Sequence, residues 1–275
     1  MQKKLLVVVA TSVLLGLSGC GLLPERADET QKWSAEKLYA EARGEMSSGQ
    51  YEAAIRLFQR LESNYPFGTY ATQAQMEIAY AHYKAQDQAE AMAAVERFIK
   101  LHPNHPQVDY MYYLRGLINF NDQVGFLSVI YSQDPTERDP KATREAFAAF
   151  KALVDKFPNS KYAPDAIARM NYLVNAMAAY EVHVANYYYR RGAYLAAVNR
   201  AQNAVADYPD APAREEALFI MLRAYDKMGM TTLRDDTRRV FLLNYPHSRF
   251  MNPNTGGDAP WWRFWGKPAP KDAIK

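Results

Sequence analysis

Apolar residues recur three and four positions apart along most of this chain, which indicates amphipathic helices with one buried face. Five of these segments end at a proline, a residue that stops a helix because it has no backbone N–H. The residue before the proline is aromatic or a histidine in every case: Tyr65-Pro66, His102-Pro103, Phe157-Pro158, Tyr208-Pro209 and Tyr245-Pro246. The spacings between these prolines are 37, 55, 51 and 37 residues. Recurrence on this scale predicts an all-α solenoid of stacked helical hairpins.

The positions counted back from each proline carry a common pattern. Alanines lie twelve residues before four of the prolines, at Ala54, Ala91, Ala146 and Ala197, and apolar residues lie five before all five, at Leu61, Phe98, Leu153, Ala204 and Phe241. Glycines seventeen residues before three of them suit the turn inside a hairpin: Gly49, Gly192 and Gly229. In the fifth segment Arg234 and Arg238 replace core-like residues, as expected of a terminal repeat with no neighbour to cover it. These positions resemble the tetratricopeptide repeat and predict five hairpins over residues 33–247.

Two of the spacings exceed 37 residues, and the local sequence explains each differently. Residues 121–140 contain Gly125, Pro135 and Pro140 and predict a long loop between the helices of the third hairpin. Residues 165–191 contain no Gly or Pro and follow Pro164, a favoured first-turn residue. They predict a single long helix.

The amino terminus has the features of an export signal. Lys3 and Lys4 precede a largely apolar segment, 5–17, that is shorter than the ~20 residues needed to span a bilayer. Leu17-Ser18-Gly19-Cys20 then resembles a bacterial lipobox, which predicts removal of residues 1–19 by cleavage between Gly19 and Cys20. By that resemblance Cys20 receives N-acyl and S-diacylglycerol lipid and anchors the chain through a linker, 20–32. By resemblance to lipoprotein sorting, the absence of an aspartate after Cys20 favours the outer membrane, and the alternative is an ordinary signal beside a free cysteine.

Charge and composition narrow the function classes. The chain has 33 basic and 30 acidic residues, and the signal carries two of the basic ones, so the mature net charge is 31 − 30 = +1. Such a balance argues against a nucleic-acid partner. His102 and His105 have a spacing found in metal sites, but Pro103 and Pro106 break the helix that would align them, and we expect no metal there. Without a phosphate-binding loop or a nucleophile motif, we expect neither an enzyme nor a cofactor site.

The order of the landmarks is more specific than the repeat itself. The lipobox, Trp33, the segment Tyr110-Met111-Tyr112-Tyr113-Leu114-Arg115-Gly116 and the turn Arg190-Arg191-Gly192-Ala193-Tyr194 together resemble the BamD family of outer membrane protein assembly factors. The resemblance covers residues 20–246. It implies a lipoprotein on the periplasmic face of the outer membrane that binds the POTRA domains of the BamA insertase and other lipoproteins of the BAM complex. It also implies that amino-terminal hairpins receive unfolded outer-membrane proteins, while carboxy-terminal hairpins hold partners. The alternative is a lipidated periplasmic adaptor that organises peptidoglycan enzymes.

First-helix positions of the hairpins supply the candidate binding groove. They predict a tyrosine-rich concave wall suited to an extended peptide that ends in an aromatic residue. Arg43 or Lys84 would pair with its terminal carboxylate. The alternative is that these tyrosines only seal contacts between hairpins. The predicted groove consists of Tyr39, Arg43, Met76, Tyr80, Tyr83, Tyr110 and Tyr113.

Two further features concern partners. Among the arginines of the last two hairpins, Arg200 has no acidic residue three or four positions away, so we predict that it contacts the insertase. The tail, 248–275, is rich in Pro and Gly and is expected to be extended or disordered, yet it contains Trp261-Trp262-Arg263-Phe264-Trp265. This aromatic cluster is interpreted either as a docking motif for a partner or the lipid interface, or as a segment that packs on the last hairpin.

Overall fold

The computed structural model describes residues 29–123, 140–248 and 250. The predicted signal, Cys20, most of the linker, residues 124–139 of the predicted loop and the tail from residue 251 lie outside the described residues.

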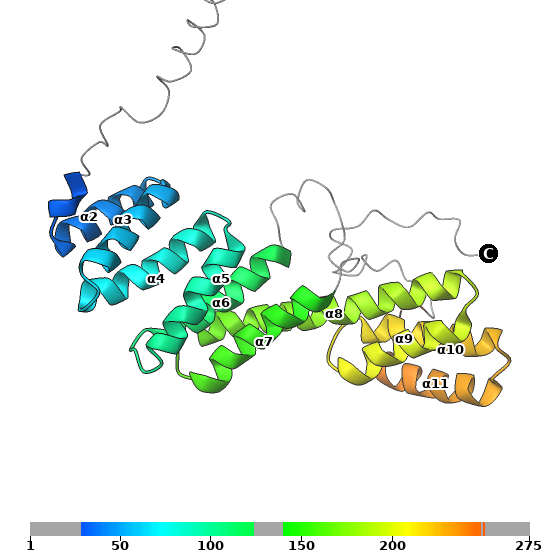
Figure 1. The fold of residues 1–275 in the computed structure, drawn as a ribbon. Coiled ribbons are helices and arrows are strands. Elements are labelled where there is room, and N and C mark those ends of the chain that lie inside the picture. Colours follow the sequence, from blue (N-terminus) through cyan, green and yellow to red (C-terminus); the bar gives the residue numbers. More distant parts are fainter. Residues whose placement is uncertain (1–28, 124–139, 249, 251–275) are drawn as a thin grey trace, which may run out of the picture.

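The described part of the chain is an elongated stack of five helical pairs, preceded by a short 3-10 helix, Glu29–Lys32 (Figure 1). No strand occurs among these residues. The all-α solenoid expected from the sequence is therefore confirmed. The pairs are α2 (Ala35–Ser47) with α3 (Tyr51–Asn64), α4 (Thr69–Lys84) with α5 (Gln88–Leu101), α6 (Val108–Gln123) with α7 (Pro140–Lys156), α8 (Ala163–Arg190) with α9 (Tyr194–Asp207), and α10 (Arg214–Lys227) with α11 (Thr231–Asn244).

The prolines end the second helix of each pair, as predicted. The residue before the proline is the C-cap, and at Tyr65 its N–H still donates to the carbonyl of Leu61, four residues back. The turn that follows leads into the first helix of the next pair.

Turns inside the hairpins require a left-handed residue. Gly49, Gly192 and Gly229 adopt φ of 81°, 77° and 70°, where a glycine has no Cβ to clash. In the second hairpin the same register position, seventeen residues before the proline, is Gln86, with φ of 65°. The geometry of the turn is therefore kept where the glycine is absent.

The two predicted insertions differ in outcome. α6 continues to Gln123 and α7 begins at Pro140, so the predicted loop starts three residues too early. Asn121 to Gln123 extend the first helix because nothing in them breaks it. The long helix is confirmed: α8 has 28 residues, about 42 Å at 1.5 Å per residue. It packs against α7, α9 and α10 and thereby joins the two halves of the stack (Figure 1).

Small and large residues share the core in the predicted register. Ala91, Val95 and Phe98 of α5 are buried against Met111 and Leu114 of α6, and each neighbouring hairpin repeats this type of contact. At the open end, Thr237 and Phe241 are the buried residues of α11, while Arg234 is half-buried and Arg238 exposed. α11 is the last helix of the described residues, and these two arginines lie outside the buried core, as expected of a terminal repeat. None of the described helices has the length and apolarity to cross a membrane.

Candidate functional site

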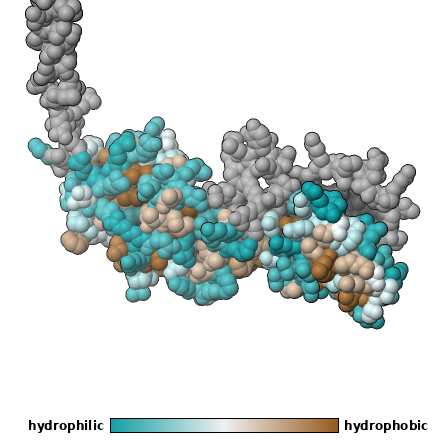
Figure 2. Space-filling view, turned by 45° about the vertical axis from the view of Figure 1, so that its right-hand side comes forward, coloured by the Kyte–Doolittle hydropathy of each residue, from teal (hydrophilic) through white to brown (hydrophobic). Residues whose placement is uncertain are grey.

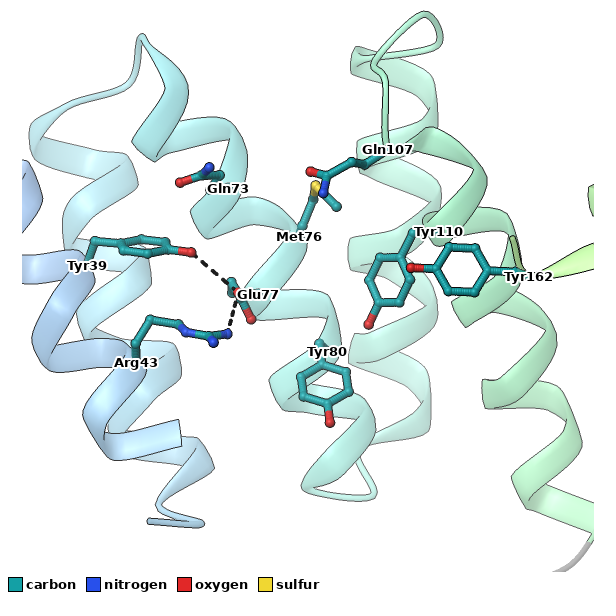
Figure 3. A pocket seen from close by; sticks show the side chains of 9 residues that line it. All are labelled: Tyr39, Arg43, Gln73, Met76, Glu77, Tyr80, Gln107, Tyr110 and Tyr162. Atoms are coloured by element: carbon teal, nitrogen blue, oxygen red, sulfur yellow. Dashed lines mark hydrogen bonds and ion pairs between the residues drawn. The ribbon is translucent and has the colours of Figure 1, made fainter. Parts of the chain in front are cut away.

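A groove lies on the side of the stack formed by the first helices of the first three pairs. It encloses about 410 Å³ between α2, α4, the start of α6 and the turn before α8 (Figure 3). Its walls carry four tyrosines, one ion pair, two amides and a thioether. The lining residues are Tyr39, Arg43, Gln73, Met76, Glu77, Tyr80, Gln107, Tyr110 and Tyr162.

Five of the seven predicted groove residues line it. Tyr39 and Arg43 are four residues apart on α2, as Met76 and Tyr80 are on α4, and this spacing places each pair on one side of its helix. Tyr110, in the first turn of α6, closes the far wall (Figure 3).

Arg43 is not free in the groove. Its Nη1 lies 2.7 Å from Oε1 of Glu77, and the Tyr39 hydroxyl donates to the same oxygen at 3.4 Å. Glu77 is 19% exposed and Arg43 53% exposed, so the carboxylate forms the floor and the guanidinium reaches solvent. Burial and the neighbouring Glu77 charge raise the pKa of Tyr39, which keeps its hydroxyl neutral. A terminal peptide carboxylate that pairs with Arg43, as predicted, would therefore share the guanidinium with Glu77.

Tyr83 and Tyr113 do not line the groove, contrary to the prediction. Tyr83, one turn beyond Tyr80, packs at the edge of the core between α4 and α6. Tyr113 stacks on Tyr162 with ring centroids 4.8 Å apart and donates to the carboxylate of Asp165 at 2.6 Å. Tyr113 thus makes a contact between successive hairpins, as the alternative interpretation describes. Lys84 lies in the last turn of α4 and is also absent from the lining.

Burial and hydrogen bonds shift the pKa values of Tyr113 and Asp165, which lie behind the groove, and of Tyr110, which lines it. Burial and the hydrogen bond to Asp165 raise the pKa of Tyr113 to about 12. Burial alone would raise the pKa of Asp165, but hydrogen bonds from Tyr113 and Arg169 outweigh it and lower that pKa. Burial and the neighbouring Tyr80 and Glu77 raise the pKa of Tyr110. Tyr39 and Tyr110 are thus neutral at physiological pH, and the groove tyrosines offer ring faces with hydroxyl groups at their tips.

Four lining residues were missed by the sequence analysis: Gln73, Glu77, Gln107 and Tyr162. Gln73 and Glu77 follow from the helix period, since Gln73 lies three residues before Met76 and Glu77 three before Tyr80. Gln107 and Tyr162 each lie four residues after the proline of the preceding hairpin. This position, four residues after the proline and just before the first helix of the next hairpin, could have predicted both residues from the sequence.

Arg200 has an acidic partner that its own helix does not reveal. Its Nη1 lies 3.3 Å from Oε2 of Glu181, on the facing helix α8. The absence of an acidic residue three or four positions away therefore does not leave Arg200 unpaired, because the hairpin brings Glu181 beside it. Its contact with an insertase stays a prediction.

The two histidines considered as metal ligands have other contacts. His102 Nε2 lies 2.9 Å from Oε1 of Gln75, and the His105 ring packs edge-on against Phe98. Within residues 29–123 and 140–248, no group of three or more Cys, His, Asp or Glu side chains is arranged to hold a metal ion.

The comparison with protein families identifies the chain. The family model described as "Outer membrane lipoprotein" (YfiO) matches residues 31–240, from the 3-10 helix into α11. The chain belongs to this family.

Two relatives in the family are similar along all or nearly all of their length. Outer membrane protein assembly factor BamD of Neisseria meningitidis serogroup A is 49% identical over 268 residues, which cover 96% of this chain and 100% of the relative. BamD of Vibrio cholerae is 39% identical over 236 residues, covering 85% and 97%. A solved structure of Podosopora anserina kinesin light chain TPR-like repeats is 16% identical with a TM-score of 0.36, covering 78% of this chain and 96% of that one.

Proposed function

We propose that this chain is a non-enzymatic, lipid-anchored factor for the assembly of outer-membrane β-barrel proteins. The observation that carries the proposal is the similarity along 85–96% of the chain to relatives named as outer membrane protein assembly factors. In this proposal the lipid on Cys20 holds the helical stack at the periplasmic face of the outer membrane. The stack then acts by binding other proteins, as helical solenoids do through their concave surfaces.

The groove of α2, α4 and α6 receives unfolded barrel proteins in this proposal. Four tyrosine rings give it flat apolar area, while Gln73, Gln107 and the tyrosine hydroxyls offer partners for peptide N–H and C=O groups. An extended carboxy-terminal segment with a final aromatic residue fits this combination. The tyrosines are packed before any ligand arrives, which lowers the entropy cost of binding.

The carboxy-terminal pairs bind the POTRA domains of BamA and other BAM lipoproteins in this proposal. Supporting it, a hollow of about 570 Å³ opens at the turn between α8 and α9 and is lined mainly by apolar residues and turn backbone. Leu195 in this hollow is 63% exposed, and Tyr194 and Met228 also line it. Large exposed apolar side chains around a hollow are typical of partner surfaces.

Affinity purification tests the assembly role. The tagged, lipidated chain is purified from detergent-solubilised envelope, and stoichiometric partners are identified. We expect BamA. Recovery of peptidoglycan enzymes without BamA would contradict the proposal and support the adaptor alternative.

Substitution of groove tyrosines tests the peptide site. Tyr80→Ala and Tyr110→Ala should each weaken binding of a synthetic carboxy-terminal barrel peptide by about tenfold or more, as loss of a central aromatic does in other interfaces. Tyr187→Ala, which removes an exposed tyrosine from α8, is the matched control. Equal affinity of all three variants, with unchanged helicity, would place the peptide elsewhere.

The Arg200 contact needs a charge-swap design. Arg200→Glu alone brings two carboxylates together in the hairpin, so a loss of BamA binding would be ambiguous. The double variant Glu181→Arg with Arg200→Glu restores the ion pair inside the hairpin. BamA binding that stays weak in the double variant supports direct contact, whereas full recovery shows that Arg200 serves only the hairpin.

A further inference from the structure

Three large apolar side chains on one side of α11 face solvent, with the exposed Asp236 between them. Leu233, Val240 and Leu243 are 46%, 42% and 82% exposed. Their spacing of seven and three residues places them on one side of the helix. Figure 2 shows hydrophobic side chains at the surface of this end of the molecule. We call these three residues the α11 stripe.

The stripe is peculiar to the last hairpin. Its residues lie thirteen, six and three positions before Pro246, and the same positions can be compared in the other four second helices. None of those helices has a large apolar residue at any of the three. The corresponding residues are Ala53, Arg60 and Ser63 in α3, Glu90, Arg97 and Lys100 in α5, Glu145, Ala152 and Asp155 in α7, and Ala196, Asn203 and Ala206 in α9.

A second departure from the repeat follows directly after α11. The Phe250 ring stacks on Phe219 of α10 with centroids 5.2 Å apart, which fixes the start of the tail beside the last hairpin. Ten residues, 251–260, then separate Phe250 from the cluster Trp261-Trp262-Arg263-Phe264-Trp265. Ten residues reach up to about 35 Å, whereas the 14 residues of α11 extend only about 21 Å. The cluster can therefore reach any point of the stripe.

We propose that the aromatic cluster 261–265 binds the α11 stripe of its own chain. The exposed leucines and the tail tryptophans are each unfavourable in water, and contact between them removes both apolar surfaces at once. A tether of ten residues gives an effective concentration of about millimolar, so a modest contact suffices to hold the tail. The tail thus forms the outer cover of the last hairpin.

Photo-crosslinking in the full, lipidated chain tests the occupant. Benzoylphenylalanine replaces Leu243, and, as a control, Phe67, which is 90% exposed in the turn between α3 and α4. We expect the probe at 243, but not at 67, to attach to the peptide that contains residues 261–265 of the same molecule. Mixing isotope-labelled and unlabelled copies distinguishes the same chain from a second copy. Attachment at 243 to a second copy, to another protein or to lipid instead would overturn the proposal.

Tryptophan fluorescence provides an independent measurement. The chain has four tryptophans, and Trp33→Phe leaves only the three of the tail. In that background we expect acrylamide to quench the chain less than a free peptide of residues 251–275 in the same detergent. Leu243→Lys should raise quenching to the level of the peptide, whereas Phe67→Lys should not. If the parent chain already matches the peptide, or if Leu243→Lys changes nothing, the tail does not bind the stripe.

Discussion

The ion pair in the groove makes a quantitative prediction about the end of a bound peptide. If a terminal carboxylate binds Arg43, it shares the guanidinium with Glu77, whose Oε1 is 2.7 Å from Nη1. Two carboxylates on one guanidinium stand about 6 Å apart, since each makes a hydrogen bond of ~2.8 Å to the same planar group. Their repulsion at 6 Å is about 0.7 kcal/mol in water and about 2.8 kcal/mol at an effective dielectric constant of 20. Because Arg43 is 53% exposed, the relevant value lies toward the lower limit, about 1 kcal/mol.

Glu77→Gln should therefore tighten binding of a peptide with a free carboxy terminus by about fivefold. Glutamine keeps an oxygen that accepts from Arg43, so the substitution removes charge and preserves the hydrogen bond. The assay compares two synthetic peptides of the same sequence by calorimetry, one with a free acid and one with a terminal amide. Only the acid should gain affinity, and adding Arg43→Gln should abolish the gain. The reasoning is refuted if both peptides change equally or if the acid does not change.

Three further predictions concern the scaffold. Gly116→Ala should lower the free energy of unfolding by about 1–3 kcal/mol in urea titrations, because a Cβ there would lie 2.4 Å from the Phe150 ring. Gln86→Gly should raise that free energy and Gly192→Ala should lower it, each by about 0.5–1 kcal/mol, because both positions have positive φ. If the two substitutions change the free energy of unfolding in the same direction, the argument is contradicted. Asp165→Asn should lower the melting temperature at pH 7, because folding lowers the pKa of the Asp165 carboxyl. Such a group stabilises the fold at any pH above its ordinary pKa of ~3.9, and this contribution is lost as the pH falls through the folded-state pKa. The melting temperatures of this variant and the parent should converge in acid, and a constant difference would show that charge is not the cause.

The scaffold was predictable where a local steric rule determines the backbone. Prolines end helices without help from distant residues, so the five second helices and their ends followed from the sequence alone. The turn at Gln86 did not follow, because nothing in an isolated glutamine signals positive φ. There the packing of the two helices on each side determines the turn, and a weak local preference gives way to it.

Helix periodicity predicted most of the first-helix residues that lie on the groove side, but it did not predict the contacts that these residues make. Tyr39, Met76 and Tyr80 were found because first-helix positions repeat along the stack. Tyr113 was predicted in the groove because its first-helix position was considered without its neighbours. In the structure its ring stacks on Tyr162, in the turn before α8, and does not line the groove. Periodicity shows which side of a helix is inward but does not show which neighbour covers it.

Several ion pairs of the stack join two helices and cannot be found by a search along one helix. Glu181–Arg200 and Glu96–Arg115 each join two consecutive helices across a turn, with the partners 19 residues apart in the sequence. Other ion pairs join corresponding helices of successive hairpins, with partners about one repeat apart. Arg43 and Glu77 are 34 residues apart in the sequence, and Glu62 and Arg97 are 35 residues apart. A charged residue in such a solenoid is therefore a strong candidate for partner contact only when opposite charge is absent both from the consecutive helix that faces it and from the position one repeat away. Arg200 does not meet this condition, and so its involvement with the insertase depends on the charge swap rather than on its apparent isolation in the sequence.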